Sequence, residues 1–85
     1  MITGGQVRAA RAFLRWSIAD LAARSGVSVP TIQRLEQADG IPSTKAQTIV
    51  DLKAACEAAG LEFIGTLDEG LGVRFRPKVN HLPLV

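Results

Sequence analysis

The chain has 85 residues, of which 47% are hydrophobic and 21% are charged, so its composition is that of a folded protein and excludes a disordered one. This length provides for one small hydrophobic core, and we expect no second independent domain. The formal net charge of +2 falls within residues 1–60 and is compatible with a polyanionic partner, although so small a charge does not indicate one by itself.

Residue types that would support other functions are isolated or missing. Cys56 is the only cysteine, so an intrachain disulfide is excluded and we place this residue in the core. His81 is the only histidine and has no companion ligands, so we expect no metal site and no cofactor. No residues suggest a nucleophile with its base, so we expect no enzymatic activity. Without a secretory signal pattern or an apolar run of about 20 residues, we expect a cytoplasmic protein that does not contact membranes.

The first predicted helix begins after a capping box. In the pair Thr3 and Gln6, each side chain can satisfy an otherwise unpaired backbone amide, and the helix should then run from residue 4 or 5 to residue 14. One face of this helix is apolar and a neighbouring face is basic. The apolar residues are Val7, Ala10 and Leu14, and the basic residues are Arg8, Arg11 and Arg15.

Two short helices follow, joined by about four residues. Ser17 with Asp20 at the third helical position predicts a second helix that ends near residue 24. Gly26 can adopt the left-handed conformation that ends a helix in a tight turn. Ser28 is the predicted cap of a third helix at about residues 29–37, which carries a proline in its first turn, where no helical hydrogen bond is lost.

A loop with glycine and proline over residues 39–42 precedes a fourth predicted helix. Thr44 with Gln47 has the capping-box spacing, so we expect this helix to run from Thr44 to about Ala59, with Gly60 as its stop. Apolar residues at three-to-four spacing should face the core. These residues are Ile49, Leu52, Cys56 and Ala59.

The hydrophobic period changes after Gly60. Residues 61–64 and 73–76 favour β-structure with partial alternation, which predicts a C-terminal hairpin. Such a hairpin must pack on the helices or on a second copy, because two isolated strands are marginally stable. One face of the hairpin is apolar and carries Leu61, Phe63, Val73 and Phe75.

The predicted fold is therefore mainly α: a four-helix bundle with a helix-turn-helix, followed by a β-hairpin. Residues 1–60 would form a helix-turn-helix domain, residues 61–76 a hairpin for packing or dimerisation, and residues 77–85 a tail whose order the sequence leaves open.

Residues 17–36 resemble the helix-turn-helix of the Cro/repressor type, found in phage repressors and small bacterial regulators. The matching residues are Leu21-Ala22, Gly26-Val27-Ser28, Thr31-Ile32, Leu35-Glu36 and Pro42. The resemblance extends over about residues 6–60, and residues 57–74 resemble short regulators of this type that end in a hairpin. It implies a repressor-like bundle whose third helix enters the major groove of DNA.

This resemblance implies two sets of DNA contacts. Arg34 is the first candidate for base reading because a guanidinium can bond a guanine edge in two places, and Gln33 is the second. The full base-contacting set is Ser28, Val29, Pro30, Gln33 and Arg34. The expected phosphate-contacting set is Arg8, Arg11, Arg15, Ser17, Thr31, Thr44 and Lys45.

The chain departs from the family at Ile18, where members often have a glutamine that helps to hold a phosphate. The resemblance implies a homodimeric repressor that reads an inverted repeat in double-stranded DNA. Two alternatives stay open at this point: an antitoxin or transcription cofactor whose hairpin and tail bind another protein, and a degenerate helix-turn-helix that binds no DNA. For Arg34 the less favoured alternative is a solvent-facing residue paired with Glu36 or Asp39.

Overall fold

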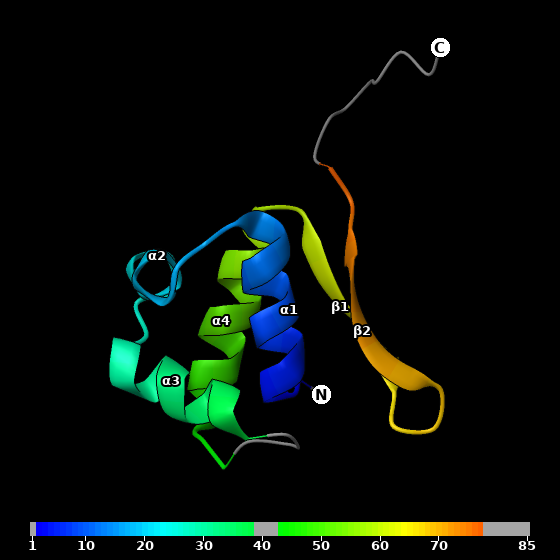
Figure 1. The fold of residues 1–85 in the computed structure, drawn as a ribbon, viewed down its shortest axis with the longest axis horizontal. Coiled ribbons are helices and arrows are strands. Elements are labelled where there is room, and N and C mark those ends of the chain that lie inside the picture. Colours follow the sequence, from blue (N-terminus) through cyan, green and yellow to red (C-terminus); the bar gives the residue numbers. More distant parts are fainter. Residues whose placement is uncertain (1, 39–42, 78–85) are drawn as a thin grey trace.

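A computed structural model of the chain describes residues 2–38 and 43–77 and shows four helices followed by a two-stranded antiparallel hairpin (Figure 1). The elements are α1 (Gly4–Leu14), α2 (Ile18–Ser25), α3 (Val29–Gln37), α4 (Ala46–Ala58), β1 (Leu61–Thr66) and β2 (Gly70–Phe75). The predicted fold class is confirmed. Across these two described ranges, each helix falls short of the length and apolar character that a membrane span requires.

The start of α1 is fixed by the predicted capping box. The backbone amide of Gln6 donates to Thr3 Oγ1 over 3.2 Å, and the backbone amide of Thr3 donates to Gln6 Oε1 over 2.9 Å. The helix ends at Leu14 and is followed by the C-cap residue Arg15, which has a left-handed backbone with φ of 59°. A side chain in this conformation is strained, because its Cβ crowds the following carbonyl group.

Both predicted caps of the helix pair are present. Ser17 Oγ accepts from the amide of Asp20 over 3.0 Å, while the amide of Ser17 donates to Asp20 Oδ2 over 2.9 Å. Gly26 has the predicted left-handed conformation, with φ of 77°, and turns the chain out of α2. Ser28 Oγ then accepts from the amide of Thr31 and begins α3.

The predicted start of α4 is wrong. The helix begins at Ala46 after Lys45, whose side chain makes no capping hydrogen bond, instead of after a Thr44–Gln47 box. The side chain of Gln47 instead turns along the helix, and its Nε2 donates to Asp51 Oδ1 on the next turn, over 2.8 Å. Thr44 lies two residues before the helix, beside α3, and a sequence pattern does not reveal that tertiary contact.

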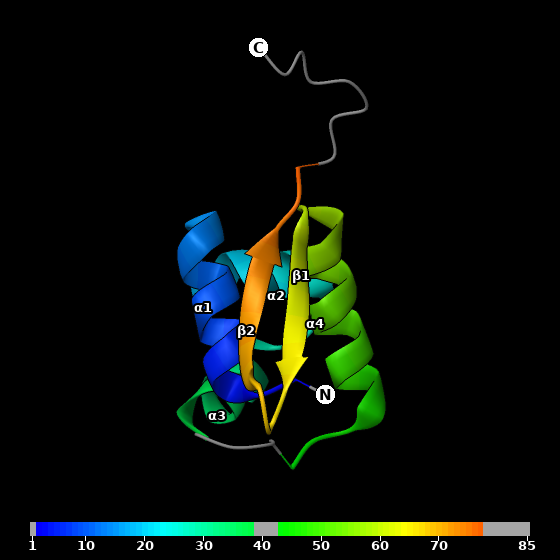
Figure 2. The ribbon, with the colours of Figure 1, turned by 90° about the vertical axis from the view of Figure 1, so that its right-hand side faces the viewer.

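The hairpin is longer than predicted and packs on the helices. Its register pairs Leu61 with Phe75 and Phe63 with Val73, which confirms the predicted apolar face. The strands extend to Thr66 and Gly70, so the glycine-rich stretch is largely paired strand. Figure 2 shows β2 alongside α1 and β1 alongside α4, with the hairpin laid across the space between these helices.

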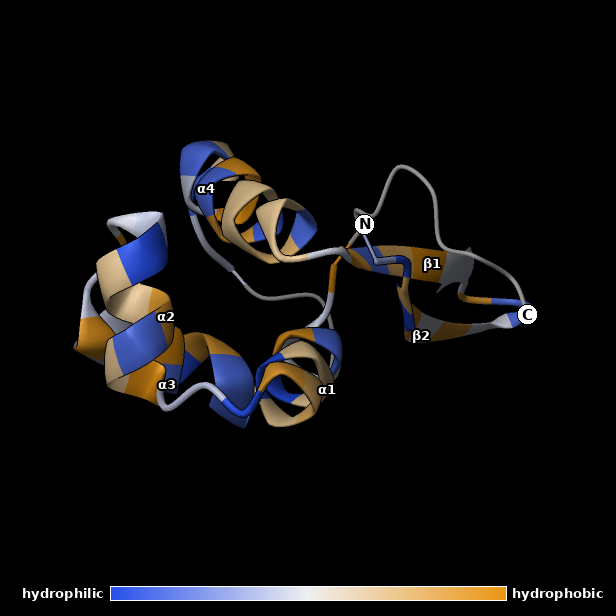
Figure 3. Cartoon of the chain, turned by 90° about the horizontal axis from the view of Figure 1, so that it is seen from above, coloured by the Kyte–Doolittle hydropathy of each residue, from blue (hydrophilic) through white to orange (hydrophobic). Residues whose placement is uncertain are grey.

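One core joins all the elements. Its fully buried side chains are Leu21, Ile32, Leu52, Leu61, Val7 and Cys56. Burial of each large aliphatic side chain contributes about 1.5–3 kcal/mol. Seen from above in Figure 3, α1 lies between α3 and the hairpin, so it contacts both the helix-turn-helix and the C-terminal strands.

Candidate nucleic-acid interface

The outer face of α3 is held toward solvent by two anchors on its inner face. Ile32 has 0% and Leu35 has 3% of its surface exposed, and both lie in the core. The side opposite these anchors carries the residues that sequence analysis singled out for base contact. Ser28, Pro30, Gln33 and Arg34 are exposed, and Val29 is partly buried.

The two hydroxyl groups at the start of α3 bond to each other. Ser28 Oγ donates to Thr31 Oγ1 over 2.8 Å while it accepts from the backbone amide of Thr31. A hydroxyl group keeps further acceptor capacity after such bonds. Ser28 thus caps the helix and still presents an oxygen at its exposed N-terminus.

Glu36 carries a buried carboxylate that sequence analysis did not foresee. Only 6% of its side chain is exposed, and both carboxylate oxygens accept hydrogen bonds of 2.9 Å from the Arg11 guanidinium. The hydrogen bond to Glu36 is the main reason why the pKa of Arg11 is raised above its ordinary value. Arg11 also donates to the carbonyl group of Trp16 over 3.1 Å.

The basic face predicted on α1 is therefore partly internal to the fold. Arg8 Nη1 donates to the backbone carbonyl group of Glu36, and Arg11 is paired with the Glu36 carboxylate. Arg15 is exposed at the end of the helix. A signal for this arrangement exists in the sequence, because Ile32, Leu35 and Glu36 share one helical face and would place the glutamate toward the core.

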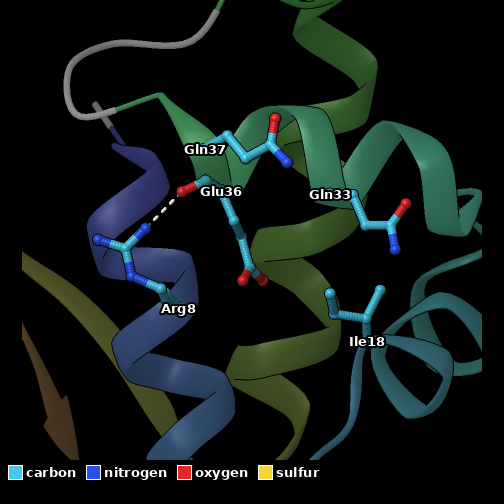
Figure 4. Close-up of a pocket in the computed structure, with 5 residues that line it drawn as sticks. All are labelled: Arg8, Ile18, Gln33, Glu36 and Gln37. Carbon is cyan, nitrogen blue, oxygen red and sulfur yellow. Dashed lines mark hydrogen bonds between the residues drawn. The ribbon is translucent and has the colours of Figure 1, made fainter.

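An open hollow of about 560 Å³ lies beside α3, where α1 and the start of α2 approach it (Figure 4). Its lining residues are Arg8, Ile18, Gln33, Glu36 and Gln37. Figure 4 shows Arg8 turned to the carbonyl group of Glu36, whereas the Gln33 amide and Ile18 lie on the opposite side. Gln37 is exposed in the last turn of α3 and is a candidate contact that sequence analysis missed.

A second hollow, of about 220 Å³, brings together residues that are distant in sequence. It lies between α3 and the segment that leads into α4. Its lining residues are Thr31, Arg34, Leu35, Ala38, Ser43 and Thr44. The guanidinium of Arg34 and three hydroxyl groups thus border one depression next to the first turn of α4.

The N-termini of α2 and α4 differ in their electrostatics. Asp20 occupies the first turn of α2, and the hydrogen bond from the Ser17 backbone is the main reason why its pKa is lowered. This carboxylate already complements the positive end of the helix dipole. The first turn of α4 has no acidic residue and no side-chain cap, and exposed Lys45 precedes it. An anion is therefore better accommodated at α4 than at α2.

The comparisons with known proteins agree with this geometry. A family model described as a helix-turn-helix domain matches residues 3–73, which include all four helices, β1 and most of β2. A search of curated proteins found no match. Because the family model covers well over half of the chain, the protein belongs to the helix-turn-helix domain family.

Proposed function

We propose that this protein is a transcriptional regulator that binds double-stranded DNA sequence-specifically, with α3 in the major groove. Membership of the helix-turn-helix family supports DNA binding, and a major groove admits one α-helix. The observation that carries the proposal is the exposed face of α3, where Gln33 and Arg34 project from a helix that Ile32 and Leu35 fix from behind.

Base reading is assigned to that face. Arg34 would bond the O6 and N7 atoms of a guanine, and Gln33 would bond the edge of an adenine. Val29 and Pro30 offer apolar contact to a thymine methyl group, and Ser28 offers a hydroxyl group. Glu36 does not compete for Arg34, because its carboxylate is bound by another guanidinium on α1.

Phosphate binding is assigned chiefly to the region around the start of α4. Lys45 is the N-cap of α4 and makes no side-chain capping bond, and helix N-termini attract anions. Thr44 and Thr31 border the hollow in front of this helix. Arg15 and Ser17 supply a second region at the junction of α1 and α2. Arg11 contributes less in this proposal, because its guanidinium is paired with the Glu36 carboxylate. Arg8 is exposed and donates only to a backbone carbonyl group, so its charge stays available to a phosphate.

The regulator would act as a homodimeric repressor on an inverted repeat. Two copies of α3 would then read half-sites about one helical turn, roughly 34 Å, apart. A second copy also suits the small size of the chain, since one module of this kind buries a limited DNA surface.

Selection of bound duplexes from a random pool, followed by sizing of the complex, tests this proposal. The expected result is an enriched inverted repeat, bound by two chains, with an affinity that falls steeply as salt is raised. Equal affinity for every duplex in a mobility-shift titration would overturn sequence-specific binding. An enriched single half-site bound by one chain would overturn the dimeric reading alone.

A further inference from the structure

Gln6 is a buried amide with hydrogen bonds on both of its ends. Its side chain is 4% exposed, and its Oε1 accepts from the amide and the hydroxyl group of Thr3, over 2.9 and 3.3 Å. Its Nε2 donates to the carbonyl groups of Ile64, over 3.2 Å, and Gly72, over 2.8 Å. Every hydrogen-bonding function of the amide is thus used.

The capping box does not account for this residue. Glutamate serves as well as glutamine in a capping box, because only an acceptor is required there. Two carbonyl oxygens need two donors, which a glutamine supplies and a carboxylate does not. Ile64 and Gly72 are cross-strand partners, so a single amide joins β1 and β2 to the first turn of α1.

The same part of α1 also contacts the end of α3. A Cβ atom on Gly4 would overlap the carbonyl oxygens of Leu35 and Ala38, which shows how closely α1 approaches the end of α3. Arg8 and Arg11, on the next turns of α1, both bond to Glu36 of α3. One face of α1 therefore holds the hairpin while another holds α3, as Figure 3 shows from above.

We propose that Gln6 is a positioning residue for DNA binding: it fixes the hairpin to the start of α1 and thereby holds α3 at the angle that the major groove requires. The inference rests on the proposed function, because its consequence is read as DNA affinity. Release of the hairpin frees the first turn of α1, so α3 samples more orientations and binding must restore the productive one. Neither Gln6 nor the hairpin needs to contact DNA for this effect.

Two substitutions of Gln6 distinguish its capping-box bond from its bonds to the hairpin. Gln6→Glu keeps the capping-box acceptor but sets a carboxylate against two carbonyl oxygens. Gln6→Met removes every hydrogen bond of the side chain while it keeps the length of that side chain. Both should speed amide hydrogen exchange in the hairpin and weaken binding to the selected duplex by roughly 3- to 30-fold. Affinities are measured at a temperature at which circular dichroism shows that all tested chains are folded. If Gln6→Glu does not fold, Gln6→Met alone tests the proposal.

Two controls isolate positioning from stability and charge. Thr3→Ala removes the hydroxyl group that accepts from the Gln6 backbone amide and leaves the Nε2 bonds, so it should lower stability without weakening DNA binding by the folded chain. Leu67→Glu adds the same charge as Gln6→Glu to a hairpin turn where Leu67 is 67% exposed, and should leave hairpin exchange unchanged.

The pH dependence of DNA affinity in Gln6→Glu is a readout that a merely structural role of Gln6 would not change. A carboxyl group buried against carbonyl oxygens has a raised pKa, and its protonated form can donate to one of them. The affinity ratio between the parent and Gln6→Glu should therefore shrink as pH falls, while the ratio for Leu67→Glu stays nearly constant.

Hairpin exchange that quickens in both Gln6 variants, together with DNA affinity within twofold of the parent, would overturn the inference. Equal weakening by Thr3→Ala would overturn it as well, because loss of the cap would then explain the effect. If the parent chain binds no duplex, the proposed function and this inference are both overturned. That result is distinguishable from the two outcomes above, in which the parent does bind DNA.

Discussion

Glu36 pairs one of the cations of α1 within the fold. Both oxygens of its buried carboxylate accept hydrogen bonds from Arg11, and its backbone carbonyl group accepts one from Arg8. Charges removed from water need such partners, since an unpaired buried carboxylate or guanidinium is costly. Of the three arginines that sequence analysis placed on α1, Arg11 is therefore paired within the fold, while Arg8 and Arg15 remain exposed.

Glu36→Gln tests this pairing. It leaves the Arg11 guanidinium with a neutral partner in a partly buried position, so the free energy of unfolding should fall by about 2–4 kcal/mol in urea titrations. Glu57→Gln is the matched control, because Glu57 is exposed and its contact with Lys53 spans 4.0 Å. The control should change stability by less than about 0.5 kcal/mol. Similar small losses in both variants would show that the Glu36 pair does not hold α1 against α3.

Arg15 combines a strained backbone with a proposed phosphate contact, and substitution separates the two. Arg15→Gly should raise the free energy of unfolding by about 1 kcal/mol, because glycine adopts a φ of 59° without steric cost. Arg15→Ala removes the same charge but keeps the strain. Both variants should bind DNA more weakly and with a reduced salt slope, whereas only the glycine variant should gain stability. Unchanged affinity in both variants would remove Arg15 from the interface.

Among the elements, those set by local chemistry were predictable and those set by tertiary contacts were not. The starts of α1, α2 and α3 follow from side chains that bond to amides three residues away, so sequence spacing alone located them. The start of α4 was misplaced because Thr44 and Gln47 have capping-box spacing, whereas the helix begins after Lys45 without a side-chain cap and Thr44 borders a hollow beside α3. The strands were predicted too short, because glycines at 65, 70 and 72 indicate a turn although they are paired here.

The N-terminus of α4 has no side-chain cap, so a substitution there should change protein stability and DNA affinity in opposite directions. Lys45 has the extended backbone of an N-cap, so Lys45→Ser should add a capping bond and raise the free energy of unfolding by about 1 kcal/mol. The same change removes a proposed phosphate contact, so the salt slope of DNA binding should fall by about one. Lys53→Ser, on an exposed part of the same helix, is the control.

Lys45 and Lys53 carry the same charge, so a difference between their variants reports the position of the lysine on α4. Calorimetry or urea titration gives the stability, and mobility shifts at several salt concentrations give the slope. Equal loss of affinity in both variants would mean that net charge, and not the start of α4, sets the electrostatic part of binding.

At the scale of the whole molecule, one core supports the helix-turn-helix and a hairpin on opposite sides of α1. The helix-turn-helix and its outward residues could be predicted, because each required residue type stands at a fixed offset between Ser17 and Glu36. The coupling of the hairpin to the bundle could not, because the bonds of Gln6 reach residues 58 and 66 positions away. The expected loop at residues 39–42 and the tail beyond Pro77 lie outside the described residues.

The central claim is that α3 reads base edges through Arg34, and a cycle that changes residue and base together tests it most directly. The affinities of the parent and of Arg34→Ala are measured on the selected duplex and on duplexes with each base pair replaced in turn. We predict that the parent loses about 1–3 kcal/mol at one guanine-containing pair in each half-site and that Arg34→Ala is indifferent to that pair. A uniform loss of affinity in Arg34→Ala, with the base profile of the parent unchanged, would contradict the claim.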